Sequence, residues 1–450
     1  MKKDHVHIIG GGLVGALTAV FLAKRDYSVS MHERRSDMRK GKVEVGRSIN
    51  LAVTSRGFKA LEEVGLKQDV LDIAIPMKGR MLHDLDGKTT FVPYGQKESE
   101  VIYSVSRGEL NKLLLTKAGE YKNVDISFDQ RCISHNLKTN EVIFVDEKTS
   151  AQKTVQAKVA LATDGAWSVT RKAMLENVMN FNYSQSFEAH GYKELVIPPA
   201  EGSGFRIDKH SLHIWPRKSF MMIALPNLDG SFTCTLFLAY KGAVSFEALK
   251  TPDDVKAFFT REFPSALALM PTLTEDFFRN PTGALATIRC APWHVDDKLM
   301  LLGDAAHAIV PFFGQGMNCG FEDCSKLGEL LDSENNWKTL FEKLEADRKP
   351  NADAIGTLAL ENFVEMRDTV ADAKFQLKKQ IGFELEKRYP GKFIPRYAMV
   401  VFHPEIPYAE AYRRGQEQEI ILDTLAAGIS DVSQVDWKKA DQLMKESKAA

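Results

Sequence analysis

The stretch His5-Val-His-Ile-Ile-Gly10-Gly-Gly12-Leu-Val-Gly15 decides the fold of the N-terminal part of this chain. Its apolar start predicts a strand, and the residues from Ala16 to Lys24 predict a helix. A second strand is predicted from Tyr27 to Glu33. A strand, a glycine turn, a helix and a strand in this order make a βαβ unit, which belongs to a parallel sheet.

The spacing Gly10-x-Gly12-x-x-Gly15, placed between a strand and a helix, predicts a dinucleotide site. Glycines allow the tight turn and let the amides of the helix N-terminus approach a pyrophosphate. Glu33 ends the next strand, where a carboxylate accepts hydrogen bonds from ribose hydroxyls, and this favours FAD or NAD over NADP. The candidate cofactor-binding residues here are Gly10, Gly12, Leu13, Val14, Gly15, Glu33 and Arg34.

Length, charge and cysteine usage exclude several classes of protein. A chain of 450 residues is too long for one ordinary core. With 59 Lys and Arg against 60 Asp and Glu, the net charge of −1 gives no field that attracts nucleic acid. The five cysteines are odd in number and form no Cys-x-x-Cys pair, which favours reduced thiols and argues against a structural zinc. No run has the length and composition of a membrane segment, so we expect a soluble, cytoplasmic protein.

The remaining elements indicate a second, antiparallel sheet and a helical end. A hairpin is predicted at Gly79–Tyr94, turning at Asp86-Gly87. The other predicted elements are helices at Gly108–Glu120, Thr251–Glu262, Gly320–Leu331 and Leu358–Lys378, and strands at Ser211–Pro216, Phe220–Leu225, Phe232–Phe237 and Lys298–Gly303. From Asn335 onward the pattern is mostly helical, with interruptions at Pro350, Pro390 and later prolines.

Two later motifs resemble the D-G and G-D signatures of FAD-dependent aromatic hydroxylases: Asp164-Gly165 after an apolar run, and Leu301-Leu-Gly303-Asp304-Ala-Ala-His307. Asp304 can accept hydrogen bonds from ribityl hydroxyls, and the turn from Gly314 to Asn318 can offer amides to the isoalloxazine edge. In this family an arginine at a helix start, here Arg107, lies against the FAD pyrophosphate. The resemblance adds Arg107, Asp164, Asp304, Gly314, Gly316, Met317 and Asn318 to the cofactor-binding candidates. We interpret His307 as a structural residue in preference to an acid–base group.

The predicted fold class is therefore α/β: a Rossmann-like FAD-binding domain interleaved with an antiparallel-sheet substrate domain, plus a helical C-terminal region. We assign residues 1–70, 100–175 and 280–330 to the FAD-binding domain. Residues 71–99 and 176–279 form the substrate domain, and residues 331–450 the helical region. The FAD is expected to be non-covalent, because no Cys, His or Tyr stands out as an attachment point.

Within these hydroxylases the chain resembles the kynurenine 3-monooxygenase family along nearly its whole length. The shared segments are Gly46–Ala52, Gly79–Asp84, Phe91–Gly95, Trp215–Arg217, Phe220–Pro226, Phe232–Phe237, Pro311–Cys319 and Glu361–Arg367. The resemblance implies hydroxylation of L-kynurenine to 3-hydroxykynurenine in tryptophan degradation, with FAD, O₂ and NADPH as a transient co-substrate. A flavin C4a-hydroperoxide would carry the oxygen, so no catalytic side chain and no metal are expected.

The substrate of this family needs a carboxylate clamp and an apolar slot for its ring. Counting outward from the hairpin turn places Arg80 opposite position 93 or 94, so Arg80 and Tyr94 are expected to be neighbours, and this pair matches the family's carboxylate-binding pair. Asn362 and Met366 share a helix face by their i, i+4 spacing and match family substrate contacts, as does Tyr397. The ring slot is assigned to Ile223, Leu225, Phe237, Pro311 and Phe312, for which core packing is an equally good interpretation.

The sequence leaves some alternatives open. Phe313 stands where some family members have histidine, which puts the local pocket in doubt. A hydroxylase of another aromatic compound, a flavin reductase or halogenase, and a non-catalytic FAD-binding protein are the competing interpretations. The site of NADPH is not predicted, because the chain contains a single dinucleotide fingerprint and FAD is assigned to it. The sequence does not predict the oligomeric state either.

Overall fold

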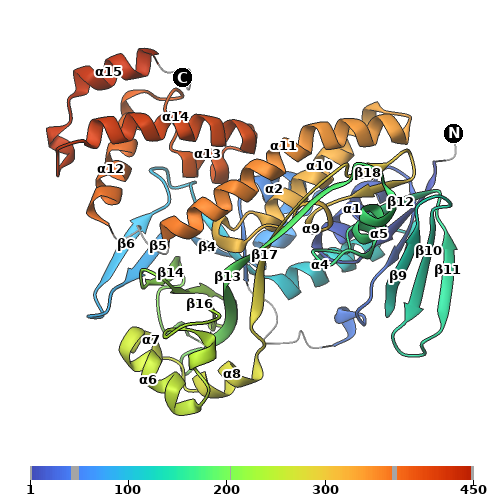
Figure 1. Cartoon of the computed structure of the whole chain (residues 1–450), viewed down its shortest axis with the longest axis horizontal. Helices are drawn as coiled ribbons and strands as arrows, with labels where there is room; N and C mark the ends of the chain where they lie inside the picture. The colour runs from blue at the N-terminus through green and yellow to red at the C-terminus, as the bar shows by residue number, and fades with distance from the viewer. Residues whose placement is uncertain (1–2, 42–49, 203, 367–371, 447–450) are drawn as a thin grey trace. The chain divides into compact units, whose positions relative to one another are not determined.

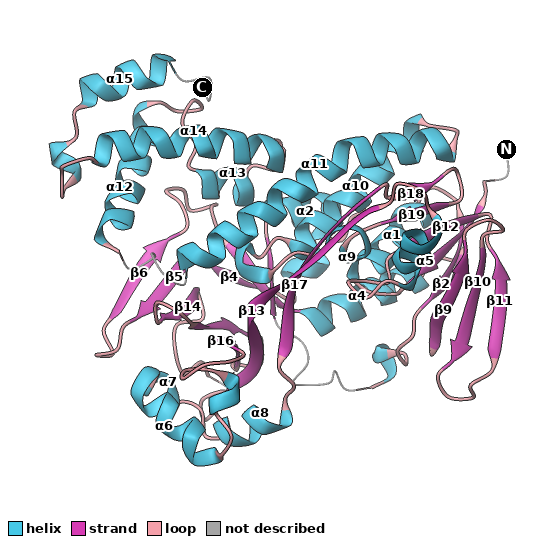
Figure 2. Ribbon diagram, in the orientation of Figure 1, coloured by secondary structure: helices cyan, strands magenta, loops and turns pink. Residues whose placement is uncertain are grey.

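The structure is a computed structural model that describes residues 3–41, 50–202, 204–366 and 372–446 (Figure 1, Figure 2). The shared segment Gly46–Ala52 lies partly outside the described residues, and Arg367 lies wholly outside them. The chain divides into two compact units, each built from three separate segments. Unit 1 contains Met1–Ala74, Val105–Glu188 and Ala284–Gly356, and unit 2 contains Ile75–Ser104, Ala189–Gly283 and Thr357–Ala450. The predicted helical region 331–450 is thus shared by both units.

Unit 1 is built on a six-stranded sheet with the order β18-β19-β12-β1-β2-β8. Its strands are β1 (His5–Ile9), β2 (Ser28–His32), β8 (Val124–Ser127), β12 (Val159–Ala162), β18 (His294–Val295) and β19 (Leu299–Leu301). All neighbours pair in parallel except β18 and β19. This confirms the predicted βαβ unit. Val6, Ile8 and Ile9 of the central β1 are fully or almost fully buried, as expected for a strand covered on both faces.

Helices cover this sheet, and α1 is the one that opens the cofactor site. The helices of unit 1 are α1 (Leu13–Ala23), α2 (Ser55–Glu63), α3 (Lys67–Leu71), α4 (Arg107–Gly119), α5 (Val169–Asn177), α9 (Asp304–His307), α10 (Gly316–Ser333) and most of α11 (Trp337–Val364). Helix α1 contacts α4 and α10. The unit also contains β3 (Asn50–Val53), a three-stranded sheet of β9 (Gln130–Asn136), β10 (Glu141–Asp146) and β11 (Gln152–Gln156), and the single turns Met38–Lys40 and Pro311–Phe313.

Unit 2 contains the second sheet that the sequence predicted. Its strands pair in the order β13-β16-β15-β14-β5-β6. They are β5 (Gly79–His83), β6 (Thr89–Pro93), β13 (Asn182–Ile197), β14 (Ser211–Pro216), β15 (Met221–Pro226) and β16 (Phe232–Ala239), and the chain also forms β4 (Ile75–Met77), β7 (Ile102–Ser106) and β17 (Gly283–Ala291). All pairs are antiparallel except β14 with β5.

One face of this sheet forms the core of unit 2. Trp215, Met222, Cys234 and Leu236 project from alternate positions of β14, β15 and β16 into an apolar cluster. The cluster is closed by Phe258, Phe259 and other residues of the helices α6 (Pro252–Glu262), α7 (Pro264–Leu267) and α8 (Leu273–Arg279). Because side chains alternate along a strand, the intervening residues face the opposite side of the sheet.

The C-terminal part of the described chain is helical, as predicted (Figure 2). After α11 come α12 (Ala373–Arg388), α13 (Arg396–Phe402), α14 (Tyr408–Ala426) and α15 (Trp437–Glu446), with Ile381, Leu385 and Ile421 among the residues of a separate apolar core. The predicted helix Leu358–Lys378 is wrong as one continuous helix, because its two ends belong to α11 and α12, and residues 367–371 lie outside the described residues. Helix α11 begins at Trp337 and passes through Pro350, and α12 begins only after Asp372, whose carboxylate accepts from the amides of Lys374 and Phe375. No helix among the described residues is long and apolar enough to cross a membrane.

Candidate functional site

Four candidate cofactor residues follow the carboxyl ends of neighbouring parallel strands of unit 1. Gly10 follows β1, Glu33 follows β2, Asp164 follows β12 and Asp304 follows β19. Parallel strands end at one edge of the sheet, and ligands of open α/β sheets bind at this edge. The topology therefore brings together residues that are up to 294 positions apart in the chain, the difference between 304 and 10.

The glycine turn is shaped for close approach of a ligand. Gly10 has φ +104°, and a Cβ atom there would lie 2.6 Å from the carbonyl oxygen of Thr163. A Cβ atom on Gly15 would lie 2.0 Å from the carbonyl oxygen of Gly10, whereas one on Gly12 would meet nothing within 4 Å. The first hydrogen bond of α1 runs from Ala16 N to Gly12 O, so the preceding amides of Leu13, Val14 and Gly15 have no such acceptor. Such a helix N-terminus is suited to a pyrophosphate.

Glu33 lies beside this turn. Its Oε2 accepts a hydrogen bond from Gly11 N at 2.7 Å, and its Oε1 accepts one from Arg35 N at 2.9 Å. The carboxylate is buried, whereas the side chain of Arg34 is exposed.

Asp164 offers a buried acceptor at the same edge. Its Oδ2 accepts from the amides of Val169 and Thr170, and its Oδ1 is buried without a hydrogen-bond partner among the described residues. Burial raises the pKa of this carboxyl group. An orphaned buried oxygen of this kind fits a hydroxyl or N–H donor of a bound cofactor.

The N-terminus of α10 provides a second set of amides. Gly314 precedes it with φ +66°, and the first helical hydrogen bond runs from Cys319 N to Gln315 O. The amides of Gly316, Met317 and Asn318 therefore precede that bond. The side chain of Asn318 donates to Ala52 O and Gly314 O and accepts from Thr54 N, so only its backbone amide remains for a cofactor.

Arg107 is the exposed first residue of α4. One helical turn later, Asn111 donates to Gly11 O at 3.3 Å, which places this end of α4 next to the glycine turn. A guanidinium group there fits the phosphates of a dinucleotide. The donors of α1 and α10 and the carboxylates of Glu33, Asp164 and Asp304 thus form a set of donors and acceptors that suits the phosphates and hydroxyls of a dinucleotide.

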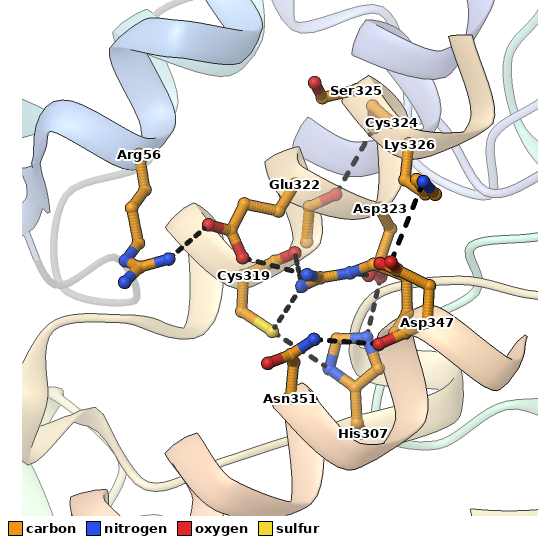
Figure 3. A network of polar contacts seen from close by, with 12 residues as sticks. Arg56, His307, Cys319, Glu322, Asp323, Cys324, Ser325, Lys326, Asp347 and Asn351 are labelled. Carbon is orange, nitrogen blue, oxygen red and sulfur yellow. Dashed lines mark hydrogen bonds and ion pairs between the residues drawn. The ribbon is translucent and has the colours of Figure 1, made fainter. Parts of the chain in front are cut away.

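His307, Cys319 and Asp323 form a buried cluster whose potential ligand atoms lie within 4.8 Å of one another (Figure 3). The Nε of Arg348 lies 2.9 Å from Asp323, and its Nη2 lies 3.4 Å from the sulfur of Cys319. A permanent cation at this distance opposes a bound metal ion, so we assign none to the cluster.

In unit 2 the hairpin of β5 and β6 has a different register from the predicted one. Arg80 lies opposite Val92, not position 93 or 94. Asp84 N bonds to Lys88 O across a three-residue loop that ends at Gly87 with φ +81°, which shifts the pairing by one residue. Arg80 and Tyr94 are nevertheless neighbours, because Tyr94 lies two positions beyond Val92 on the same face. The Cζ of Arg80 lies 5.8 Å from the centre of the Tyr94 ring.

Tyr397 completes this group, which we call the carboxylate clamp: Arg80, Tyr94 and Tyr397. The two tyrosine rings stack with centres 5.5 Å apart, and the Cζ of Arg80 lies 5.0 Å from the Tyr397 ring centre. Among the described residues, neither Arg80 Nε nor Tyr94 Oη has a hydrogen-bond partner, although both atoms are buried. Burial raises the pKa of Tyr94 and of Tyr397, so both phenols remain protonated donors at neutral pH.

Two charged residues at the clamp were missed by the sequence analysis. Glu365 Oε1 lies 4.0 Å from Arg80 Nη1, and Lys379 Nζ donates to Pro93 O at 3.1 Å. Burial, assisted by the nearby charge of Arg80, lowers the pKa of Lys379 to about 7. Glu365 lies between Asn362 and Met366, inside the segment Glu361–Arg367 that resembles the family, so the sequence did contain a signal for it. Lys379 had none, because its place depends on how α12 packs.

The apolar candidates of unit 2 lie on the same side of the sheet as Arg80. Arg80 pairs with Leu212, and Ile214, two positions on, pairs with Ile223. Residues directly opposite each other share a face, so Ile223 and its alternate Leu225 face the same way as Arg80. Phe237 joins them, because it lies opposite Met221. This is the face opposite to the core of unit 2.

The remaining candidates are placed as follows. Asn362 and Met366 are buried on one helix face, and Asn362 Nδ2 lies 3.3 Å from the sulfur of Met366. Pro311 and Phe312 belong to unit 1, in the single turn before α10, where Phe313 is also buried. The structure thus places Arg80, Ile223, Leu225 and Phe237 on one face of the unit 2 sheet. Pro311 and Phe312 lie in unit 1, in the turn before α10.

Comparisons with known proteins agree with this geometry. A family model described as an FAD binding domain matches residues 3–358. The chain is 46% identical over 444 residues to kynurenine 3-monooxygenase of Myxococcus xanthus (strain DK1622), covering 99% of this chain and 95% of the relative. It is 42% identical over 455 residues to kynurenine 3-monooxygenase of Dictyostelium discoideum, covering 98% of this chain and 97% of the relative.

Solved structures show the same fold at lower identity. A tetrameric form of 2-methyl-3-hydroxypyridine-5-carboxylic acid oxygenase matches with a TM-score of 0.66 at 17% identity, over 90% of this chain and 98% of the other. The p-nitrophenol 4-monooxygenase from Pseudomonas putida DLL-E4 matches with a TM-score of 0.64 at 17% identity, over 94% and 98%. The fold class is confirmed and FAD is the cofactor. The chain belongs to the kynurenine 3-monooxygenase family of FAD-dependent aromatic monooxygenases.

Proposed function

We propose that this enzyme hydroxylates L-kynurenine at ring position 3, using NADPH and O₂. The observation that carries the proposal is the carboxylate clamp, in which Arg80 Nε and Tyr94 Oη are buried without partners among the described residues. A buried guanidinium and two protonated phenols suit an anionic ligand that arrives with its own acceptors. The apolar Ile223, Leu225 and Phe237 on the same sheet face suit an aromatic ring.

In this proposal each part of the substrate has a named partner. Arg80 forms a charge-assisted pair with the carboxylate, and Tyr94 and Tyr397 donate to the same group. Glu365, which lies 4.0 Å from Arg80, accepts from the α-ammonium group. Ile223, Leu225 and Phe237 hold the ring. Asn362 of α11 and Met366, two residues beyond the end of that helix, contact the substrate.

FAD, when bound, supplies the redox chemistry with NADPH and O₂ that side chains lack. Leu13, Val14 and Gly15 would hold its pyrophosphate together with Arg107, Glu33 would hold its ribose, and Gly316–Asn318 would hold the edge of its ring system. The protein's remaining task is to orient the substrate ring and to exclude water. NADPH binds transiently in this scheme. The five buried free cysteines support a reducing, cytoplasmic location.

The test is NADPH oxidation by the FAD-loaded protein at saturating NADPH, with and without L-kynurenine, followed by chromatographic identification of the product. We expect slow oxidation alone, a sharp increase with L-kynurenine, and formation of 3-hydroxykynurenine. Decarboxylated kynurenine, which lacks the group that the clamp binds, should stimulate poorly.

Two results would contradict the proposal. Equal oxidation rates with and without L-kynurenine would show that it is not the substrate. Equal stimulation by a simple phenol and by L-kynurenine would instead indicate a hydroxylase of another aromatic compound.

A further inference from the structure

A single buried carboxylate joins two of the cofactor-binding segments of unit 1. Asp323 lies on α10, seven residues after Gly316, and is 0% exposed. Its Oδ2 accepts from His307 Nε2 at 2.7 Å (Figure 3). The same Oδ2 accepts from Gly303 N at 3.0 Å, and Oδ1 accepts from Arg348 Nε at 2.9 Å. Gly303 directly precedes Asp304, and Asp323 shares its helix with Gly316–Asn318.

The segment held by Asp323 has a demanding conformation. Gly303 has φ +58° and ψ −140°, and a Cβ atom there would lie 2.9 Å from the Cγ2 of Val14 at the start of α1. A second charged side chain holds the same segment, because Arg171 Nη1 donates to Ala305 O at 2.7 Å. An anion and a cation thus fix the orientation of the turn that presents Asp304.

The electrostatics show that Asp323 is ionised. Burial alone would raise the pKa of Asp323, but His307 and Arg348 lower it to about 2. Burial likewise opposes the charge on His307, whose pKa is nevertheless raised well above its usual value, chiefly by Asp323. Arg348 also pairs with Glu322 at 3.0 Å, and Glu322 pairs with Arg56 of α2 at 2.7 Å. The network therefore extends from the turn after β19, through α10 and α11, to α2.

We propose that Asp323 is a positioning residue for FAD. Its carboxylate sets the separation between Asp304 and the amides of Gly316–Asn318, so that one flavin can contact both. A buried ion pair often adds little net stability, and an apolar replacement of the whole network can leave a protein equally stable. Its value here lies in fixing the distance between two binding segments, while His307 orients the Oδ2 atom that accepts from Gly303.

The test measures FAD binding to the apoprotein by flavin fluorescence and compares the visible absorption and circular dichroism of the bound flavin. For Asp323→Asn we expect the Kd of FAD to rise at least about tenfold, which corresponds to about 1.4 kcal/mol, and the flavin bands to shift. Asp332→Asn is the matched control, since Asp332 lies on the same helix, is exposed, and pairs with Arg25. It should bind FAD like the unmodified protein.

A second pair of variants separates the hydrogen bond from the fold. His307→Gln keeps an N–H donor at the position of Nε2 and should stay within about threefold of the original Kd. His307→Leu removes the donor and should raise the Kd about tenfold or more, because it leaves a buried acceptor with one partner fewer.

The proposal is overturned if Asp323→Asn lowers the melting temperature of the apoprotein but leaves the Kd and the flavin spectra equal to those of Asp332→Asn. In that case Asp323 supports only the fold. If Asp323→Asn does not fold, the histidine pair decides: equal FAD affinities of His307→Gln and His307→Leu overturn the proposal. Since the ligand in this test is FAD alone, the result does not depend on whether L-kynurenine is the substrate.

Discussion

Replacing Arg80 tests whether the carboxylate clamp binds the substrate carboxylate. Arg80→Met leaves a substrate carboxylate buried without its counter-charge, which we expect to cost about 2–5 kcal/mol of binding free energy. This is a loss of about 30- to several-thousand-fold in apparent affinity for L-kynurenine. Tyr94→Phe should cost about 1–3 kcal/mol, because the carboxylate keeps its arginine. Steady-state kcat/KM and equilibrium titration measure both effects.

Decarboxylated kynurenine is the control for Arg80→Met, and Lys88→Met on the exposed hairpin loop is the control variant. The decarboxylated compound should bind poorly to the original enzyme and be nearly indifferent to the Arg80 change. If both compounds lose the same factor in kcat/KM, Arg80 supports the fold or the flavin, and its assignment to the substrate is wrong.

Lys379 makes the clamp sensitive to pH. Its pKa is lowered to about 7, so its positive charge is present below that pH and lost above it. The other charged groups that act on it are Arg80 and Glu365. We expect L-kynurenine to bind about 3- to 10-fold more weakly at pH 8 than at pH 6, a difference of about 1 kcal/mol. Titration of substrate into the FAD-loaded protein at both pH values measures it.

Lys379→Arg and Lys379→Met distinguish this charge from the titration of the substrate itself. The arginine variant should bind tightly at both pH values, and the methionine variant weakly at both. A pH dependence that is equal in all three proteins would assign the titration to another group.

At the scale of single elements, β1 and β2 carry two neighbouring histidines, the half-buried His7 and the buried His32. His7 Nδ1 lies 3.4 Å from His32 Nε2, and the ring of His32 stacks on Phe144 with centres 4.2 Å apart. Burial, together with the neighbouring His5 and Lys153, lowers the pKa of His7 to about 4, and burial, His7 and Lys153 do the same for His32. Both rings are therefore neutral in the folded protein at neutral pH.

This pair of histidines predicts a loss of stability in mild acid. A depressed histidine pKa contributes stability that is present above the unfolded value of about 6.5 and is lost as the pH falls from there toward about 4. We expect the melting temperature of the apoprotein to drop as the pH falls from about 6.5 to about 4.5, and the drop to be smaller for His32→Gln. His403→Gln, in unit 2, is the control, and a drop as large in His32→Gln as in the control would contradict this account.

The elements also show how far the sequence could be read. The βαβ unit and β14 were predicted accurately, because their patterns are local: a glycine turn, an alternating strand, a helix of small and apolar residues. The hairpin register was wrong by one residue, since the turn residues Asp86-Gly87 fit both a two-residue and a three-residue loop. Pro350 was expected to interrupt the helix, but Ile355, Leu358 and Ala359 are fully buried in α11, and this packing outweighs the local cost of proline.

For the candidate site, the sequence identified residues and the fold identified their relations. Arg80 and Tyr94 were paired from the hairpin alone, but that Tyr397 stacks on Tyr94 depends on the packing of α13 and had no local signal. The position of Lys379 and the three hydrogen bonds that Asp323 accepts likewise depend on tertiary packing and had no local signal.

For the whole molecule we expect stoichiometric, non-covalent FAD. All five cysteines are buried, and none of the residues assigned to the flavin is a Cys, His or Tyr. The purified protein should be yellow, and acid precipitation should release all of the flavin into the supernatant. Yellow colour that stays with the precipitate would contradict the non-covalent attachment.

The alternation of the two units along the chain has a consequence for synthesis on the ribosome. Strand β1 pairs with β12, which in turn pairs with β19. The last of the residues assigned to FAD, Asn318, lies near the start of α10. At about 5–20 residues per second, roughly 15–60 s pass between translation of the first strand and of the turn after β19. During that interval β12 has no β19 to pair with. The β12 edge of the sheet therefore stays without its partner β19, and FAD has no complete site, until about two thirds of the polypeptide has been made.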